Sequence, residues 1–97
     1  GTKSSGTLTP DEADGNFQKA VNGGAHTLAP PAVGTNEATV VSILYTNNAS
    51  AGAVTISGFT KTAGVFSTTT AHEFIVRLEA INDGSTTFSF CTIEALQ

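Results

Sequence analysis

The sequence predicts an all-β protein, a single compact antiparallel β-sandwich or small jelly-roll-like barrel of about seven or eight short strands. Apolar and polar residues alternate with a period of two along much of the chain, which is the pattern of half-buried strands. Clusters of Gly, Asn, Asp and Pro interrupt this pattern at short intervals. The sixteen threonines also favour strands, because β-branched side chains suit a pleated surface. At 97 residues, the chain can bury one hydrophobic core but not two.

The beginning of the chain differs from the rest. The first five residues carry no large apolar side chain, so we expect residues 1–6 to form a flexible arm and residues 7–97 to form the domain. We expect Gly1 to follow removal of an initiator methionine, and an excised domain is the alternative. The segment Thr9-Pro10-Asp11-Glu12 has the form of a capping box, in which the Thr9 hydroxyl accepts from the backbone N–H of Glu12. It predicts at most one helical turn near residues 10–14, ended by Gly15.

Strands are predicted from residue 17 onward. Residues 17–22 and 26–29 form two short candidates, and Asn22-Gly23-Gly24 between them is typical of a hairpin turn. Pro30-Pro31 ends the second strand, because consecutive prolines cannot donate to a ladder. Residues 38–46 give the strongest signal and have apolar side chains on both faces. This favours a central strand or one that lies across a subunit contact.

The second half of the chain continues in the same way. Val54 and Ile56 alternate with Thr55 and Ser57, and Phe59 follows Gly58. Ala63-Gly64 then divides residues 60–62 from Val65-Phe66. Residues 72–81 and 86–95 alternate most regularly and predict a long hairpin. Its turn, Asn82-Asp83-Gly84-Ser85, contains the Asp-Gly pair of a type I′ turn.

The residues that could carry chemistry are few. His26 and His72 are the only imidazoles, and we expect both to be exposed or to lie on edge strands, without a catalytic or metal-binding role. Cys91 lies within a strand and is expected to be an unreactive small hydrophobe. The one acidic cluster is assigned to helix capping: Asp11, Glu12 and Asp14. We therefore predict no catalytic residue, no cofactor and no bound metal, and we do not expect an enzyme.

Charge sets the classes of partner that we expect. The net charge is −4, with only 12% of residues charged, which argues against binding to nucleic acid or to an anionic membrane. Contacts with another protein are expected to depend on shape and on the main chain more than on ion pairs.

Three segments resemble short all-β structural proteins of tailed bacteriophages: Gly15–Gln18, Asn22–Pro31 and Ala49–Phe59. The similarity extends over about residues 7–97 and rests on a Thr-Leu-x-x-Pro strand end and a Gly-Ala-x-Thr-Ile-x-Gly-Phe hairpin. Many fibre relatives carry a tryptophan near the end of the second hairpin strand, and this chain has none. The resemblance implies a virion component, in the first place a capsid decoration (cement) protein. The alternative is a phage tail or head fibre domain that binds a receptor or a carbohydrate.

The resemblance also implies the partners and the location of the protein. A decoration protein binds the major capsid protein on the capsid exterior, after synthesis in the host cytoplasm, and often acts as a homotrimer. Bound copies that bridge shell subunits would stabilise the expanded shell by mass action. We expect the contact residues to be Thr2, Lys3 and Leu8 of the N-terminal segment, together with Phe59, Val65 and Phe66. For Phe66, burial in the protomer's own core is the equal alternative.

Deletion of residues 1–8 is expected from the sequence to weaken capsid binding and to leave the melting temperature of the isolated domain nearly unchanged. Unchanged occupancy of capsids by the deletion variant would contradict a role for the arm.

Overall fold

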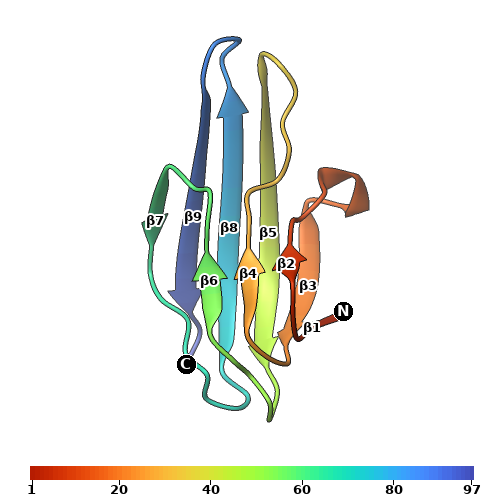
Figure 1. The fold of residues 1–97 in the computed structure, drawn as a ribbon, viewed down its shortest axis with the longest axis vertical. Coiled ribbons are helices and arrows are strands. Elements are labelled where there is room, and N and C mark those ends of the chain that lie inside the picture. Colours follow the sequence, from red (N-terminus) through yellow and green to blue (C-terminus); the bar gives the residue numbers. More distant parts are fainter.

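The computed structural model describes residues 1–97 as two packed β-sheets with one short 3-10 turn (Figure 1). The larger sheet has six strands in the order β1-β3-β5-β8-β9-β7, and the smaller has three in the order β2-β4-β6. The elements are β1 (Thr2–Lys3), β2 (Thr7–Leu8), η1 (Glu12–Asp14), β3 (Phe17–Asn22), β4 (His26–Leu28), β5 (Glu37–Asn47), β6 (Val54–Ile56), β7 (Lys61–Ala63), β8 (Glu73–Asn82) and β9 (Thr87–Ala95). The prediction of a compact all-β protein is confirmed.

The chain winds between the two sheets like a solenoid. From β1 to β7, successive strands alternate between the six-stranded and the three-stranded sheet. Each coil therefore places its strand beside the corresponding strand of the previous coil, in parallel. Thr7 pairs with Thr27 and Leu8 with Leu28. Thr27 and Leu28 pair in turn with Thr55 and Ile56 of β6. The β8–β9 hairpin then occupies the place between β5 and β7.

This winding differs from the antiparallel arrangement that we expected. Five of the seven strand pairings are parallel, and only β5–β8 and β8–β9 are antiparallel. The expected hairpin at Asn22-Gly23-Gly24 is wrong, because β3 and β4 lie in different sheets. The glycines allow close packing at this corner, and neither has a positive φ. A Cβ on Gly24 would lie only 2.8 Å from the Ser4 carbonyl oxygen.

The N-terminal arm lies on the chain's own sheets. β1 pairs in parallel with β3, and β2 pairs in parallel with β4. Leu8 also packs against the hydrophobic core. Deletion of residues 1–8 would thus remove two strands, so we now expect it to lower the stability of the domain, contrary to the expectation from the sequence.

The predicted helical turn is present as η1. Its cap is Asp11, whose carboxylate accepts from the Ala13 N–H at 2.9 Å, and not Thr9. Gly15 follows the turn as expected. The Thr39 hydroxyl donates to the Glu12 carboxylate at 2.8 Å, which fastens η1 to β5.

The β8–β9 hairpin is confirmed, but its turn is not type I′. Asn82 pairs with Thr87, which leaves the four-residue loop 83–86. A type I′ turn needs two positive φ angles, and only Gly84 has one. The Asp83 carboxylate instead accepts from the N–H groups of Ser85 and Thr86. The bond from Thr86 first, and then that from Ser85, lowers the pKa of Asp83.

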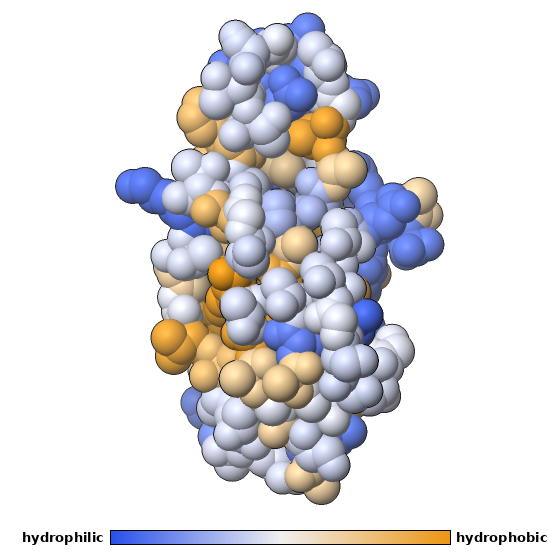
Figure 2. Space-filling view, in the orientation of Figure 1, coloured by the Kyte–Doolittle hydropathy of each residue, from blue (hydrophilic) through white to orange (hydrophobic).

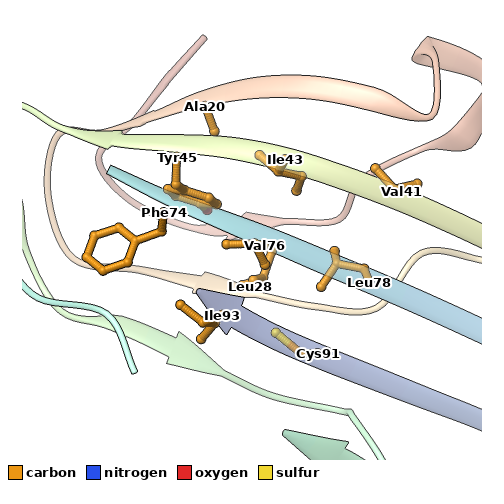
Figure 3. Packing of buried hydrophobic residues seen from close by; sticks show 10 residues of the cluster. All are labelled: Ala20, Leu28, Val41, Ile43, Tyr45, Phe74, Val76, Leu78, Cys91 and Ile93. Carbon is orange, nitrogen blue, oxygen red and sulfur yellow. The ribbon is translucent and has the colours of Figure 1, made fainter. Parts of the chain in front are cut away.

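The core lies between the sheets and follows the alternation along each strand (Figure 3). Tyr45 of β5, Phe74 of β8 and Leu28 of β4 are its largest fully buried side chains. Each fully buried side chain of this kind contributes about 1.5–3 kcal/mol relative to an exposed one. The cluster contains Ala20, Leu28, Val41, Ile43, Tyr45, Phe74, Val76, Leu78, Cys91 and Ile93.

Two buried asparagines hold the coils together at one corner. Asn22 ends β3 and Asn47 ends β5, and the two are partners in the parallel register. The Asn22 side chain donates to the Gly52 carbonyl at 2.8 Å and accepts from the N–H groups of Gly24 and Gly52. The Asn47 amide donates to the carbonyls of Ser67 and Thr69. Each asparagine thus fixes the loop of a later coil.

Asn22→Ala is expected to lower the free energy of unfolding by about 2–4 kcal/mol, because it removes three hydrogen bonds and leaves the half-buried backbone groups of Gly24 and Gly52 without these partners. Denaturant unfolding would measure the loss. Asn82→Ala is the matched control, because Asn82 accepts a single exposed bond from Gly84, and its cost should stay below about 1 kcal/mol. Equal costs for both variants would contradict the role of the Asn22 corner.

Candidate functional site

The outward face of the six-stranded sheet carries an extended apolar surface. On β3, β5, β8 and β9, inward core residues alternate with outward residues, and many of the outward ones are large and apolar. Three of these are strongly exposed: Phe17 by 54%, Val40 by 47% and Phe88 by 40%. The half-buried members of this outer face are Val21, Leu44, Ile75, Ile81 and Phe90.

Strand register brings these side chains together across the sheet. Ile81 pairs with Phe88 between β8 and β9, and Leu44 pairs with Ile75 between β5 and β8. Residues directly opposite one another have Cβ atoms about 4.5–5.5 Å apart, so each pair forms an apolar cluster. Arg77 and Glu79 lie between these two pairs along β8. No strand of the chain packs over this side, since the three-stranded sheet covers the other one.

Charged side chains share the outer face with these apolar clusters: Lys19, Glu73, Arg77, Glu79 and Glu94. Glu79 lies between Val40 and Phe90 in the register. Arg77 and Glu94 approach to 3.7 Å, with both side chains more than half exposed. Solvent screening makes an exposed pair of this kind weak. The face therefore offers clusters of apolar side chains that are separated by charged ones.

A polar pair of side chains lies inside the molecule, between the two sheets. His26 and Tyr45 stack with ring centroids 5.9 Å apart, and the Tyr45 hydroxyl lies 2.9 Å from His26 Nε2. His26 Nδ1 lies 2.8 Å from the Gly24 carbonyl, which can only accept, so Nδ1 carries the proton and Nε2 accepts from Tyr45. Burial, with a smaller contribution from Cys91, raises the pKa of the Tyr45 phenol above its usual value.

His26 is therefore a satisfied core residue and not the exposed or edge-strand histidine that we expected. It is 5% exposed and lies in β4, the central strand of its sheet. The sequence obscured this because the Tyr45 partner is contributed by the opposite sheet. This geometry orders the core and leaves the imidazole inaccessible to a substrate.

The other side chains that could take part in a reaction are either hydrogen-bonded within the protein or buried. The Ser67 hydroxyl lies 3.0 Å from His72 Nδ1, and this half-buried pair closes the loop before β8. Cys91 is buried, and desolvation raises the pKa of its thiol to about 11, so the nucleophilic thiolate is scarce at neutral pH. No group of three or more His, Cys, Asp or Glu side chains is arranged to hold a metal ion.

The structure separates the six contact residues that the sequence suggested. Thr2, Lys3 and Leu8 line a pocket of about 220 Å³ beside β1 and β3. Val65 and Phe66 line a groove beside β6, and Val65 is 80% exposed. Phe59 and Phe66 pack against the core. Phe66 also makes edge-on contacts with Tyr45 and Phe74, at centroid distances of 5.0 and 5.3 Å.

Sequence reasoning missed the outer face as a site. The sequence did contain a signal for this face, because residues 38–46 have apolar side chains on both sides of the strand. The alternation along residues 86–95 also places Phe88 and Phe90 on one side of the strand and Cys91 on the other. Which of the two sides faces solvent depends on the position of the other sheet. That position is a tertiary property, and Phe17, Val40 and Phe88 were therefore not selected.

Comparison of the chain with protein-family models, curated proteins and solved structures finds no match. No helix in the structure has the length and apolar character needed to cross a bilayer. The resemblance to phage structural proteins thus rests on the three segments quoted above.

Stability is expected to fall at alkaline pH, because the folded state keeps the Tyr45 phenol protonated while the unfolded chain ionises it. Its contribution is complete below about pH 10, the usual pKa of tyrosine, and decreases above it by up to about 1.4 kcal/mol per pH unit. Tyr45 is the only tyrosine and the chain has no tryptophan. Its ultraviolet absorbance should therefore report ionisation only on unfolding.

Denaturant unfolding at several pH values would provide the test. Tyr45→Phe should remove the part of the loss that begins near pH 10, and Cys91→Ala should retain it. Ionisation of Tyr45 at its usual pKa in the folded protein would contradict this prediction.

Proposed function

We propose that this protein is a structural binding module that attaches to a larger protein assembly through the outward face of its six-stranded sheet. The apolar surface of that face carries the proposal. It includes the exposed side chains of Phe17, Val40 and Phe88 on β3, β5 and β9, and no strand of the chain covers it. Clusters of exposed apolar side chains on a protein surface commonly mark a protein interaction site.

We further propose, from the resemblance of the three segments, that the assembly is a phage capsid and that the protein decorates its shell. The partner is then the major capsid protein, and the outer face lies against the capsid exterior. Copies that bind two neighbouring subunits stabilise the assembled shell by mass action, because they bind the assembled state and not free subunits. Association of the protein into a homotrimer is part of this proposal.

The low charge of the chain is consistent with this mode of attachment. A contact made by apolar side chains depends weakly on salt, whereas one made by exposed ion pairs is screened at physiological ionic strength. Arg77–Glu94 is the only ion pair in the structure, and both of its side chains lie on the outer face. Capsid binding through the outer face should thus persist at high salt.

A fibre domain that binds a carbohydrate is the second candidate. The observation in its favour is that Phe17 and Phe88 are exposed on the outer face, where aromatic rings can stack on sugars. Tyr45, the one aromatic residue with a polar tip, is fully buried and unavailable for this purpose. Binding to a glycan array would favour the fibre domain, and binding to capsids without glycan binding would favour the decoration protein.

Val40→Lys is expected to reduce binding to phage capsids about tenfold or more, because it places a charge within the apolar contact. Co-sedimentation with candidate capsids would measure occupancy. The introduced ammonium group would face Glu79 across the strands, so the free energy of unfolding should change by less than about 0.5 kcal/mol.

Thr7→Lys is the matched control for this experiment, because Thr7 is an exposed β-branched residue of β2, in the three-stranded sheet on the opposite side of the molecule. Its capsid occupancy should equal that of the unmodified protein. Equal occupancy for Val40→Lys and the unmodified protein would overturn the assignment of the outer face.

A further inference from the structure

Strand β6 leaves one edge of the three-stranded sheet without a hydrogen-bonding partner. Its only paired neighbour is β4. The His26 N–H donates to the Ala53 carbonyl, and the Ser57 N–H donates to the Leu28 carbonyl. In a parallel pair, this pattern directs the backbone groups of Ala53, Thr55 and Ser57 toward β4. The N–H and C=O groups of Val54 and Ile56 therefore point to the open edge, and no hydrogen bond satisfies them.

A groove of about 290 Å³ lies at this open edge. One wall is formed by Val54 and Ile56 of β6, and the other by the segment 64–68 that follows β7. Figure 2 shows hydrophobic surface beside β6, toward the left of the view. The second wall lies close against β9, because a Cβ on Gly64 would collide with the Ile93 carbonyl oxygen. The two walls thus bound a slot within the layer of the three-stranded sheet.

The segment 64–68 does not complete that sheet. No backbone hydrogen bond joins Gly64, Val65 or Phe66 to β6. The three-stranded sheet is also three strands narrower than the sheet it packs on, a difference of about 14 Å at the usual strand spacing. The geometry leaves space beside β6 for an added strand.

The existing register indicates which residues suit that place. Leu8, Leu28 and Ile56 lie in one row across β2, β4 and β6, and their side chains point toward the core. Thr7, Thr27 and Thr55 form the adjacent row on the outward side. A fourth strand would continue both rows, with a large apolar residue beside Ile56 and a small polar one beside Thr55.

We propose that the β6 edge binds an extended, uncharged segment of another protein by β-strand addition, with alternating apolar and small polar residues. None of the nine residues that line the groove is charged, so a charged segment would lose its hydration without gaining a partner. Main-chain bonds to Val54 and Ile56 provide affinity, and the apolar side chains provide selectivity.

A single segment fits this slot better than a second copy of the whole domain. A copy that aligned its own β2 with β6 would bring along its wider six-stranded sheet. That sheet would meet β9 and β7 of the first copy, which already occupy the layer beneath. The site is separate from the outer face, so it does not depend on the function proposed above.

A synthetic peptide with the sequence of residues 24–31, Gly-Ala-His-Thr-Leu-Ala-Pro-Pro, is a suitable probe, because β4 supplies the Thr-Leu pattern of the existing rows. Amide hydrogen exchange followed by NMR should show new protection at Val54 and Ile56 when the peptide binds. The Thr55 amide should keep its protection, because it already faces β4. A peptide with aspartate at its leucine position should bind about tenfold more weakly or worse.

Two variants of the protein complete the experiment. Val65→Lys should raise the dissociation constant of the peptide about tenfold, whereas Val40→Lys on the outer face should leave it unchanged. Absence of binding at millimolar peptide would overturn the proposal, as would loss of protection at Thr55, which would indicate displacement of β4. Protection of Val54 and Ile56 without peptide, in a protein that is dimeric by molar mass, would also overturn it by assigning the edge to a second copy.

Discussion

Parallel pairing between successive coils is the constraint on which the rest of this structure depends. A parallel neighbour must enter from the same end, so the chain has to cross to the other sheet and return before each new strand. These crossings create the corners after β3 and β5, where the buried side chains of Asn22 and Asn47 bond to backbone groups of the loops. A buried backbone group without a partner costs free energy comparable to a lost hydrogen bond. The two asparagines therefore anchor the loops of the winding to the core, and of their polar side-chain atoms only the Asn47 Oδ1 is buried without a partner.

The same winding produces the surfaces to which we assign binding. A solenoid-like coil has open strand edges at its ends, because each coil pairs only with its neighbours. At β6 this edge remains free, whereas the β8–β9 hairpin continues the larger sheet as far as β7. The inserted hairpin also widens the face that carries Phe17, Val40 and Phe88. One topological feature thus leaves an exposed apolar face on one layer and an unfilled edge on the other.

Several elements followed from local chemistry and were predictable. Asp83 and Gly84 specify a turn, so the β8–β9 hairpin and its alternating strands were identified from the sequence. The proline and acids near residues 10–14 predicted the short helical turn, although Asp11 and not Thr9 provides the cap. The Asn22–Gly24 corner was misassigned, because a short polar link between two strands has the same composition in a hairpin and in a crossing between sheets. One signal of the winding was available. The pattern Thr-Leu-x-Pro occurs at Thr7–Pro10 and again at Thr27–Pro30, and these two segments are neighbours in the register.

The sequence by itself determined the secondary-structure class, the position of most strands and which side chains alternate along them, because these depend on residues close together in the chain. It also determined the low charge and the small number of reactive groups. Only the tertiary structure decided which strands pair, which side of β5 faces solvent and that His26 is buried against Tyr45. Strand pairing joins residues far apart in sequence, and many partners satisfy the same alternation. The choice between them depends on packing the whole core at once.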